Sequence, residues 1–384
     1  MKISFLTLNA YALGGTVRAT FDLASELAER HDVEVISVNQ RADQPFLPVS
    51  PKVRLRSLVD QREGARVRWP YTKKAERLSK QKSALIHPHE RTYGFFTAWS
   101  DEVLRRELQR LRTDVLITTR AGLNIMAARF APERVVRIAQ EHLHFEAHRP
   151  GMSKEIRRWY PKLDAVVTLT EADRHDYRTM LDRAPTRVFA IGNGLAGRPR
   201  PRSRQDNRIV LAAGRLVPVK GYTRLLKAFA EVIKERPDWK LRIYGQGRSE
   251  EQLAKLVVKL RLHDNVTLMG PTDDIEGELA KASIHAVSSR FEGFGMTIIE
   301  AFACGVPVVS FDCPRGPREI ITSGHDGLLV PPGDVDALAA GLLKMIDDEE
   351  GRLRMAGNAL ETARRYDISM IVDRWEKAFA ELGR

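Results

Sequence analysis

The first half of the chain alternates between short apolar runs and longer segments whose apolar residues recur with helical spacing. The apolar runs are mostly continuous, which is typical of parallel strands covered on both faces. The segment 16–31 places Val17, Phe21, Ala24 and Leu27 on one helical face. This order predicts a doubly wound α/β domain. Its expected strands are 2–8, 33–38, 114–119, 135–140, 165–170 and 187–191.

The same alternation resumes at residue 208 and predicts a second α/β unit with its own core. A helix expected over 222–237 carries Leu225, Phe229 and Val232 on one face, and another is expected over 250–260. We expect the two doubly wound units to face a central cleft, because ligands of such sheets bind outside the carboxyl ends of the strands. The expected strands of the second unit are 208–214, 240–245, 265–270, 284–289 and 306–311.

Three segments break this alternation. Residues 192–208 are rich in Gly, Pro, Arg and Ser, which predicts a linker between the units. Residues 50–112 hold 16 basic and 7 acidic side chains without a clear period, which favours an irregular insertion on the first unit. A final amphipathic helix over 368–382 has no preferred packing partner on these grounds. The expected boundaries are 1–195 for the first domain, 196–207 for the linker and 208–367 for the second domain.

The net charge of +12 is spread unevenly over the 384 residues. Residues 1–208 hold 38 basic and 24 acidic side chains, whereas residues 209–384 hold 24 and 26. The positive first half predicts an anionic partner: nucleic acid, a phospholipid surface or an acidic substrate. The alternative is a solvated basic face without a partner.

Cysteine content and hydropathy indicate a cytoplasmic protein. The only cysteines, Cys304 and Cys313, have no CxxC partner, so neither zinc nor a disulfide framework is expected. No apolar run approaches the roughly 20 residues that span a bilayer. The apolar start of the chain is too short for a signal peptide and predicts a buried first strand.

The stretch EGFGMTIIEAFACG, residues 292–305, follows an expected strand and leads into a short helix. Gly293 and Gly295 allow backbone N–H groups to approach a ligand, and the helix N-terminus favours a phosphate. Glu292 precedes the helix and Glu300 lies about a turn and a half inside it. Carboxylates fit beside a phosphate if they accept hydrogen bonds from hydroxyls, as a sugar nucleotide would supply. The alternative is that Glu292 is a loop charge and Glu300 belongs to a structural pair.

The segment AAGRLVPVKGY, residues 212–222, ends another expected strand and continues into a loop with two cations that could neutralise a diphosphate. Arg215 can bind phosphate bidentately and Lys220 acts as a point charge, although such a pair is more often a surface feature. Gly14 and Gly15 separate the first strand from the first helix, where the backbone could again approach a ligand closely. A lone glycine pair is weak evidence, and it is neither a dinucleotide fingerprint nor a Walker A loop.

These motifs resemble family 4 of the glycosyltransferases, which have the GT-B fold. The residues that carry the resemblance are GRLVPVKG (214–221), RIYGQG (242–247), NVTLMG (265–270) and the stretch from Ser288 to Val330. The segment FDCPRGPREII within that stretch resembles bacterial enzymes that add hexosamine or glucose to lipid-linked glycans or wall teichoic acids. Asp312, Arg315 and Glu319 lie in this segment and receive no role.

The resemblance implies transfer from a UDP-sugar, or a GDP-sugar, with retention of anomeric configuration and without a metal or cofactor. Glu292 would hold the donor sugar and Glu300 the ribose. Arg215 and Lys220 would stabilise the departing β-phosphate. Backbone N–H groups at Phe294 and Gly295 would contribute to the same field.

For the first domain, the resemblance implies an acceptor site and a histidine that touches the donor sugar. His142 directly follows an expected strand and is the candidate; otherwise it is a loop histidine. A metal cluster with His144 and His148 is disfavoured, because the spacing matches no recognised ligand pattern. Asn193 and Gly194 resemble the family's turn before the linker. The helix over 368–384 is expected to return to the first domain.

We therefore expect a retaining, metal-independent transferase that moves a hexose or N-acetylhexosamine to a cell-wall polymer, a lipid-linked glycan or another anionic acceptor. The basic first domain would hold the protein at the inner face of the membrane, with Trp159 and Tyr160 as interfacial anchors. The alternatives are a small-metabolite acceptor, a nucleotide-sugar hydrolase or epimerase, and a non-enzymatic polyanion-binding protein. Nucleic acid is not an expected partner, because RNA-recognition and zinc-finger signatures are missing. The basic residues expected to surround these two anchors and to meet the membrane or the anionic acceptor cluster between 149 and 208. They are Arg149, Lys154, Arg157, Arg158, Lys162, Arg198, Arg200, Arg202 and Arg204.

Overall fold

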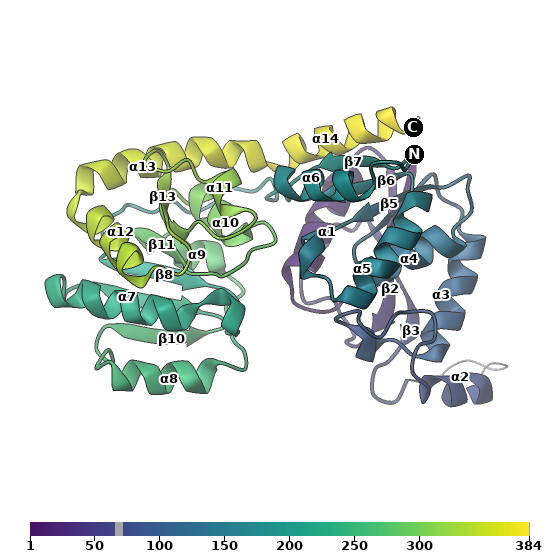
Figure 1. The fold of residues 1–384 in the computed structure, drawn as a ribbon, viewed down its shortest axis with the longest axis horizontal. Coiled ribbons are helices and arrows are strands. Elements are labelled where there is room, and N and C mark those ends of the chain that lie inside the picture. Colours follow the sequence, from purple (N-terminus) through teal and green to yellow (C-terminus); the bar gives the residue numbers. More distant parts are fainter. Residues whose placement is uncertain (66–71, 384) are drawn as a thin grey trace. The chain divides into compact units, whose positions relative to one another are not determined.

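The chain folds into two α/β units in a computed structural model that describes residues 1–65 and 72–383 (Figure 1). The first unit comprises 1–196 and 368–384, and the second comprises 197–367. None of the helices in the described ranges is long and apolar enough to cross a bilayer.

The first unit is built on a seven-stranded parallel sheet with the order β3-β2-β1-β4-β5-β6-β7. Every strand expected between residues 1 and 195 is present. The strands are β1 (Lys2–Thr7), β2 (Asp32–Gln40), β3 (Arg54–Asp60), β4 (Val115–Thr118), β5 (Val136–Gln140), β6 (Ala165–Thr168) and β7 (Arg187–Ala190). The helices are α1 (Gly15–Leu27), α2 (Thr72–Ser79), α3 (Ala98–Arg110), α4 (Ala121–Phe130), α5 (Pro150–Trp159), α6 (Glu171–Met180) and α14 (Ile368–Glu381).

Both faces of this sheet are covered, which explains the continuous apolar runs. Successive side chains of a strand point to opposite faces. Accordingly, Phe5 of β1 packs in a core with α1 and α14, whereas Leu6 packs in a second core with α3 and α4. Both side chains are almost completely buried.

The C-terminal helix α14 packs on the first unit. Trp375 is fully buried among residues of α1 and the sheet. The amide of Ile368 donates to the carbonyl of Leu195 at 3.0 Å. A side chain at Gly194 would lie 2.8 Å from Ile368, so the glycine permits this close approach.

The segment 50–112 is not the irregular insertion that its composition predicts. It supplies the edge strand β3, which pairs in parallel with β2, and also the helices α2 and α3. The strand was missed because it alternates charged and apolar residues. Arg56, for example, pairs with Glu34 at 3.0 Å and with Glu107 at 2.5 Å. Residues 66–71 of the segment lie outside the described part of the chain.

The second unit contains a six-stranded parallel sheet with the order β10-β9-β8-β11-β12-β13. The five expected strands are present, and the four-residue β13 was not foreseen. The strands are β8 (Ile209–Ala213), β9 (Lys240–Tyr244), β10 (Val266–Gly270), β11 (Ile284–Val287), β12 (Val308–Phe311) and β13 (Gly327–Val330). The helices are α7 (Tyr222–Glu235), α8 (Glu250–Lys259), α9 (Ile275–Leu279), α10 (Met296–Ala303), α11 (Pro317–Ile320), α12 (Val335–Asp347) and α13 (Glu349–Ala363).

The expected linker has no helix or strand after residue 196, but it is firmly attached to the second unit. Arg198 and Arg200 both pair with the buried carboxylate of Glu276 at 3.0 Å. The hydroxyl of Ser203 donates to the carbonyl of Ala282 at 2.6 Å, and Gln205 donates to a carbonyl of the same unit at 2.9 Å. The linker arginines therefore belong to the second unit, and their placement with the first domain was wrong.

Candidate functional site

The residues predicted to form the site fall into both units. Gly14, Gly15 and His142 lie in the first unit, and the remaining candidates lie in the second.

In the second unit, a tight loop follows β8 and carries two of the candidate cations. Lys220 ends a 3₁₀ turn (Pro218–Lys220), and Gly221 adopts a left-handed φ of 69° before α7 begins. A side chain at Gly221 would lie only 2.0 Å from the carbonyl oxygen of Ser288, just after β11. The Ser288 hydroxyl donates to the carbonyl of Lys220 at 2.9 Å. Because β8 and β11 are neighbours, the loops at their carboxyl ends pack together.

This packing brings Lys220 and Glu292 into direct contact. Lys220 Nζ donates to Glu292 Oε1 at 2.6 Å, and the Ser289 hydroxyl donates to the same oxygen at 2.6 Å. The two charged side chains are 20% and 9% exposed. Arg215 is exposed and makes no side-chain hydrogen bond or ion pair within the described residues. Glu292 lies in a loop, but it is a buried, paired carboxylate and not a solvated charge. Its role in donor binding stays a prediction.

The glycine-rich turn before α10 is held by a second loop. Gly295 caps the helix with a left-handed φ of 111°. Gly316, in the loop after β12, lies so close that a side chain there would meet the carbonyl oxygen of Phe294 at 1.8 Å. The ring of Phe294 is buried and makes an edge-to-face contact with Tyr366, with centroids 5.8 Å apart. Phe294 thus presents only its backbone to a ligand at this turn.

Glu300 lies inside α10, as expected, and is 5% exposed. The three residues left without a role lie in the loop after β12 or in α11. Asp312 accepts from Arg318 Nε at 2.9 Å, and Arg315 has an unusual left-handed φ of 68°. Burial, with a further contribution from Glu292, raises the pKa of the Cys313 thiol in this loop to about 12.

In the first unit, Gly14 and Gly15 stand at the N-terminus of α1. A side chain added at either position would meet no atom within 4 Å. The fold of this unit therefore does not itself require glycine there. A role for these two residues in donor binding stays a prediction.

His142 follows β5 at its carboxyl end, where the neighbouring β4 is followed by Arg120. Its Nε2 atom is buried and has no hydrogen-bond partner within the described residues. Burial lowers the pKa of His142 to about 4, and the nearby charge of Arg120 contributes further. The imidazole is therefore neutral at physiological pH and can exchange a hydrogen bond with a hydroxyl.

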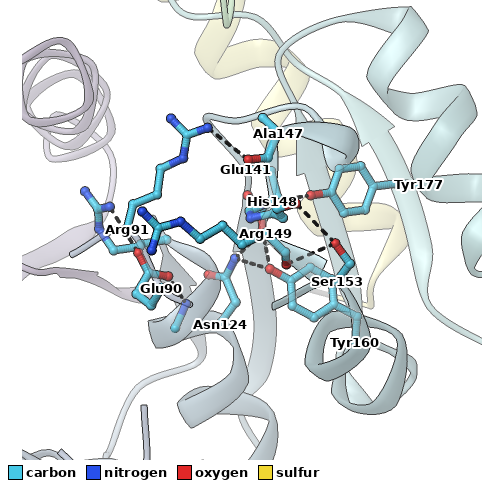
Figure 2. Close-up of polar contacts among 12 residues, drawn as sticks. Glu90, Arg91, Asn124, Glu141, Ala147, His148, Arg149, Ser153, Tyr160 and Tyr177 are labelled. Carbon is cyan, nitrogen blue, oxygen red and sulfur yellow. Dashed lines mark hydrogen bonds and ion pairs between the residues drawn. The ribbon is translucent and has the colours of Figure 1, made fainter. Parts of the chain in front are cut away.

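A buried polar network next to His142 was not anticipated (Figure 2). The carboxylate of Glu141 accepts from Asn124 at 2.9 Å and from the hydroxyl of Tyr160, and lies 3.6 Å from His148. His148 also lies 3.2 Å from the Tyr177 hydroxyl. Burial, followed by the charge of Glu141, raises the pKa of Tyr160 far above its usual value, so the phenol stays protonated and can donate.

The network concerns two expectations: Tyr160 as a membrane anchor and His148 as a possible metal ligand. Tyr160 is fully buried and cannot act as an interfacial anchor. His148 pairs with a carboxylate and a phenol, and no group of three His, Cys, Asp or Glu side chains in the described ranges is gathered in a way that could hold a metal ion. The position of Glu141, adjacent to His142 at the end of a strand, was the signal available in the sequence.

Two family models cover most of the chain and divide it at the boundary between the units. "Glycosyltransferase Family 4" matches residues 13–196, and "Glycosyl transferases group 1" matches residues 197–362. The chain belongs to family 4 of the glycosyltransferases. Within this family, the second model covers the Lys220–Glu292 pair and the first covers His142.

Several bacterial relatives are similar to this family 4 chain over its whole length. An exopolysaccharide phosphotransferase of Streptomyces coelicolor is 38% identical, with 100% of this chain and 41% of the relative covered. An uncharacterized glycosyltransferase of Haemophilus influenzae is 26% identical, with 98% and 99% covered. The chain thus spans less than half of the Streptomyces protein and nearly all of the Haemophilus protein.

Solved structures share the GT-B architecture of two Rossmann-like domains. Staphylococcus aureus TarM, solved with fondaparinux, α-GlcNAc-glycerol and UDP, has a TM-score of 0.78 at 16% identity, covering 98% of this chain and 99% of TarM. Anabaena HepE, solved with UDP and glucose, has a TM-score of 0.76 at 22% identity, covering 99% of this chain and 100% of HepE. At these identities, the likeness establishes the fold of this family 4 chain.

Proposed function

We propose that the protein is a retaining glycosyltransferase that moves a hexose or N-acetylhexosamine from a UDP-sugar to an anionic glycan, cell-wall polymer or lipid-linked acceptor. The observation that carries the proposal is the buried contact between Lys220 and Glu292, which lies where loops from β8 and β11 meet before α10. A cation, a carboxylate and a helix N-terminus at one place suit a ligand with both phosphates and hydroxyls.

In this proposal, the donor diphosphate lies at the N-terminus of α10. Backbone N–H groups at Phe294 and Gly295 and the side chains of Arg215 and Lys220 supply positive charge there. Donor binding would separate Lys220 from Glu292, so that the ammonium meets the phosphate and the carboxylate meets sugar hydroxyls. Glu300, farther along α10, would accept hydrogen bonds from the ribose.

The chemistry requires no protein base in this arrangement. The bond between the anomeric carbon and the β-phosphate oxygen breaks, and the acceptor hydroxyl forms the new bond on the face that the phosphate leaves. The departing phosphate takes the hydroxyl proton. Lys220 and Arg215 stabilise the charge that develops on that phosphate. His142, neutral at physiological pH, would hold a donor-sugar hydroxyl.

Two observations support an anionic acceptor: the positive charge of the first unit and the activity named for a relative. The first unit, counted from the sequence, holds 36 basic and 26 acidic residues, whereas the second holds 26 and 24. A Bacillus subtilis relative, 29% identical over 60% of this chain and 35% of its own length, is named poly(glycerol-phosphate) alpha-glucosyltransferase. We accordingly place the acceptor on the first unit and the reaction at the cytoplasmic side of the membrane.

The experiment incubates the purified protein with UDP-glucose, UDP-GlcNAc or UDP-GalNAc and a poly(glycerol phosphate) or lipid-diphosphate acceptor. We expect an acceptor heavier by one sugar, an α-linkage by NMR and undiminished rates in EDTA. Release of free sugar alone would favour a hydrolase. Transfer of a sugar together with its phosphate would favour the chemistry named for the Streptomyces relative. A strict need for Mn²⁺ or Mg²⁺ would contradict the metal-independent mechanism.

A further inference from the structure

We propose that Arg91, Arg120 and Arg149 form an oxyanion site in the first unit, and that it binds a phosphate group of the acceptor beside His142. The inference rests on the proposed function for the identity of the ligand as an acceptor. It rests on the structure for the site itself, which lies in the loops that follow β4 and β5.

Three separate segments bring the arginines together. Arg120 is the second residue after β4 and caps the start of α4, and Arg149 directly precedes α5. Arg91 lies in a loop that reaches across to them, because its guanidinium donates to the carbonyl of Ala147 at 2.9 Å. In Figure 2 the side chain of Arg149 extends from its loop toward Arg91 and Glu90.

Buried contacts hold the framework of this site. Glu90 is 5% exposed, and its carboxylate accepts from the amide of Gly122 at 3.0 Å. Arg120 lies 3.5 Å from the other oxygen of the same carboxylate. The loop of Arg91 is attached a second time, since the amide of Gly151 donates to His89 at 3.0 Å. The arginines thus lie on loops that are joined to one another by hydrogen bonds and an ion pair.

The charges at this place do not balance. Among the described residues, Glu90 is the carboxylate that contacts one of these arginines, Arg120, and it also accepts from the amide of Gly122. The carboxylate of Glu141 is turned into the buried network with Tyr160. Arg149 is exposed and its guanidinium has no partner in the described ranges. Like charges held together without counter-charges favour the binding of an anion.

The neighbouring His142 indicates that a ligand reaches this place. Its Nε2 atom is buried without a hydrogen-bond partner in the described part of the chain, which costs free energy unless a ligand supplies one. Arg120 lies close enough to lower the pKa of that imidazole. Guanidinium groups match phosphate oxygens bidentately, so a phosphate ester or diphosphate suits the site better than a neutral sugar.

The test measures binding of phosphate-bearing acceptors with UDP present in saturating amount, so that the donor site is occupied. One arm uses a short poly(glycerol phosphate) oligomer, and the other uses a sugar joined through diphosphate to a short isoprenyl chain. Arg91→Ala and Arg149→Ala should each weaken binding about 10- to 100-fold. The affinity of Arg149→Lys should fall between those of Arg149→Ala and the wild type. Lysine keeps the positive charge but loses the two parallel N–H donors with which a guanidinium binds phosphate.

Arg157→Ala is the matched control. Arg157 is also exposed and basic, lies on α5 and stacks on the ring of Phe145 at 4.9 Å. It should leave acceptor binding within about twofold of wild type. The arm that responds to Arg149→Ala identifies whether the phosphate belongs to a polymer or to a lipid diphosphate. Equal losses in Arg149→Ala and Arg157→Ala, or a wild type that binds neither probe, would overturn the site.

Kinetics separate this site from the proposed function. If the site is correct, Arg149→Ala raises the KM for the phosphorylated acceptor about 10-fold or more while the KM for the UDP-sugar is unchanged. Transfer with an unaltered acceptor KM would refute the arginine site and leave the function standing. Arginine-dependent binding without any transfer would refute the function and leave the site standing.

Discussion

Lys220 Nζ lies 2.6 Å from Glu292 Oε1, so two residues expected to serve different parts of a donor contact each other directly. Both are largely shielded from water. Each therefore satisfies the other, and in the proposed function a phosphate and a sugar would replace this contact. The pair connects the stability of the second unit to its proposed activity.

Glu292→Gln should retain UDP binding and lower turnover strongly, because the carboxylate is assigned to the sugar and not to the nucleotide. Lys220→Ala and Arg215→Ala should each lower kcat by on the order of 10²–10³, as the loss of an oxyanion-hole donor does. Steady-state kinetics with calorimetry of UDP binding measure both effects. Near-normal turnover in all three variants would refute the site.

The same pair makes a prediction about stability. Within the described part of the chain, Lys220→Ala leaves the buried Glu292 side chain with Ser289 as its donor, and it should lower the free energy of unfolding by about 1–3 kcal/mol. Arg215→Ala, an exposed cation of the same loop, is the control and should change it by less than about 0.5 kcal/mol. Chemical denaturation distinguishes the two. Equal stabilities would indicate that the contact contributes nothing.

Glu300→Ala should weaken UDP binding by one to two decades, because ribose hydroxyls lose a charged acceptor worth about 1.5–3 kcal/mol. Calorimetry with UDP, which lacks the sugar, isolates this contribution. Glu361→Ala, which removes an exposed carboxylate on α13, is the control. Unchanged UDP affinity in Glu300→Ala would remove this residue from the ribose site and favour the structural alternative.

His285 predicts a pH-dependent stability. It is fully buried in β11, donates from Nδ1 to the carbonyl of Leu211 at 3.0 Å, and its pKa is lowered to about 4 by burial. Between pH 6.5 and 4 the unfolded chain binds the proton and the folded chain does not, so stability falls as the pH falls. From pH 6.5 to 5 the loss should be about 1.5–2 kcal/mol.

The matched variant is His285→Gln, which keeps a polar side chain but cannot titrate. Between pH 6.5 and 5, the free energy of unfolding of the variant should fall by about 1.5–2 kcal/mol less than that of the wild type. Denaturant titrations at pH 6.5, 6 and 5 make the comparison. Parallel pH profiles for wild type and variant would show that His285 titrates normally in the fold.

The basic surface of the first unit predicts salt-sensitive attachment to anionic membranes. The exposed cations Lys73, Lys74, Arg77, Lys80 and Lys82 lie on α2 and just after it. Each cation near an anionic surface contributes about 1 kcal/mol to the free energy of membrane binding, and this attraction decays within a Debye length. We expect binding to anionic liposomes, its loss at about 0.5 M salt and no binding to neutral liposomes.

Replacing these five residues with Glu should weaken liposome binding and leave donor turnover unchanged. The control replaces Arg248, Lys255 and Lys259, which are exposed at α8 of the near-neutral second unit. A wild-type protein that ignores both anionic liposomes and polyanionic acceptors at low salt would indicate a solvated basic face. The small-metabolite acceptor would then be favoured.

The central strands and helices could be predicted from the sequence because burial on both faces leaves a local signal. The apolar face of α7, with Leu225, Leu226 and Phe229 fully buried, is such a case. Edge strands carry a weaker signal, because one side is open to water. For this reason the sequence of β3, in which Arg54 and Arg56 alternate with apolar residues, predicts an irregular segment and not a strand.

The candidate site was foreseen as a set of residue types but not as a set of contacts. Lys220 and Glu292 are 72 positions apart, and their pairing depends on Gly221 packing against Ser288. The Glu141 network likewise joins β5, α4 and the segment after α5. A rule that inspects the first two residues after every central strand would have selected Arg120 together with Glu141 and His142.

The attachment of the linker to the second unit has a consequence for proteolysis. A segment with arginines at 198, 200, 202 and 204 looks like an open site for trypsin, yet the first two precede prolines and are paired to Glu276. Cleavage after the other two would require Ser203 and Gln205 to detach from the second unit. Proteases cut such segments only when they open locally. The apparent weak point of the chain should therefore resist digestion, and a fragment meant to contain the second unit should begin at residue 197 rather than at residue 208.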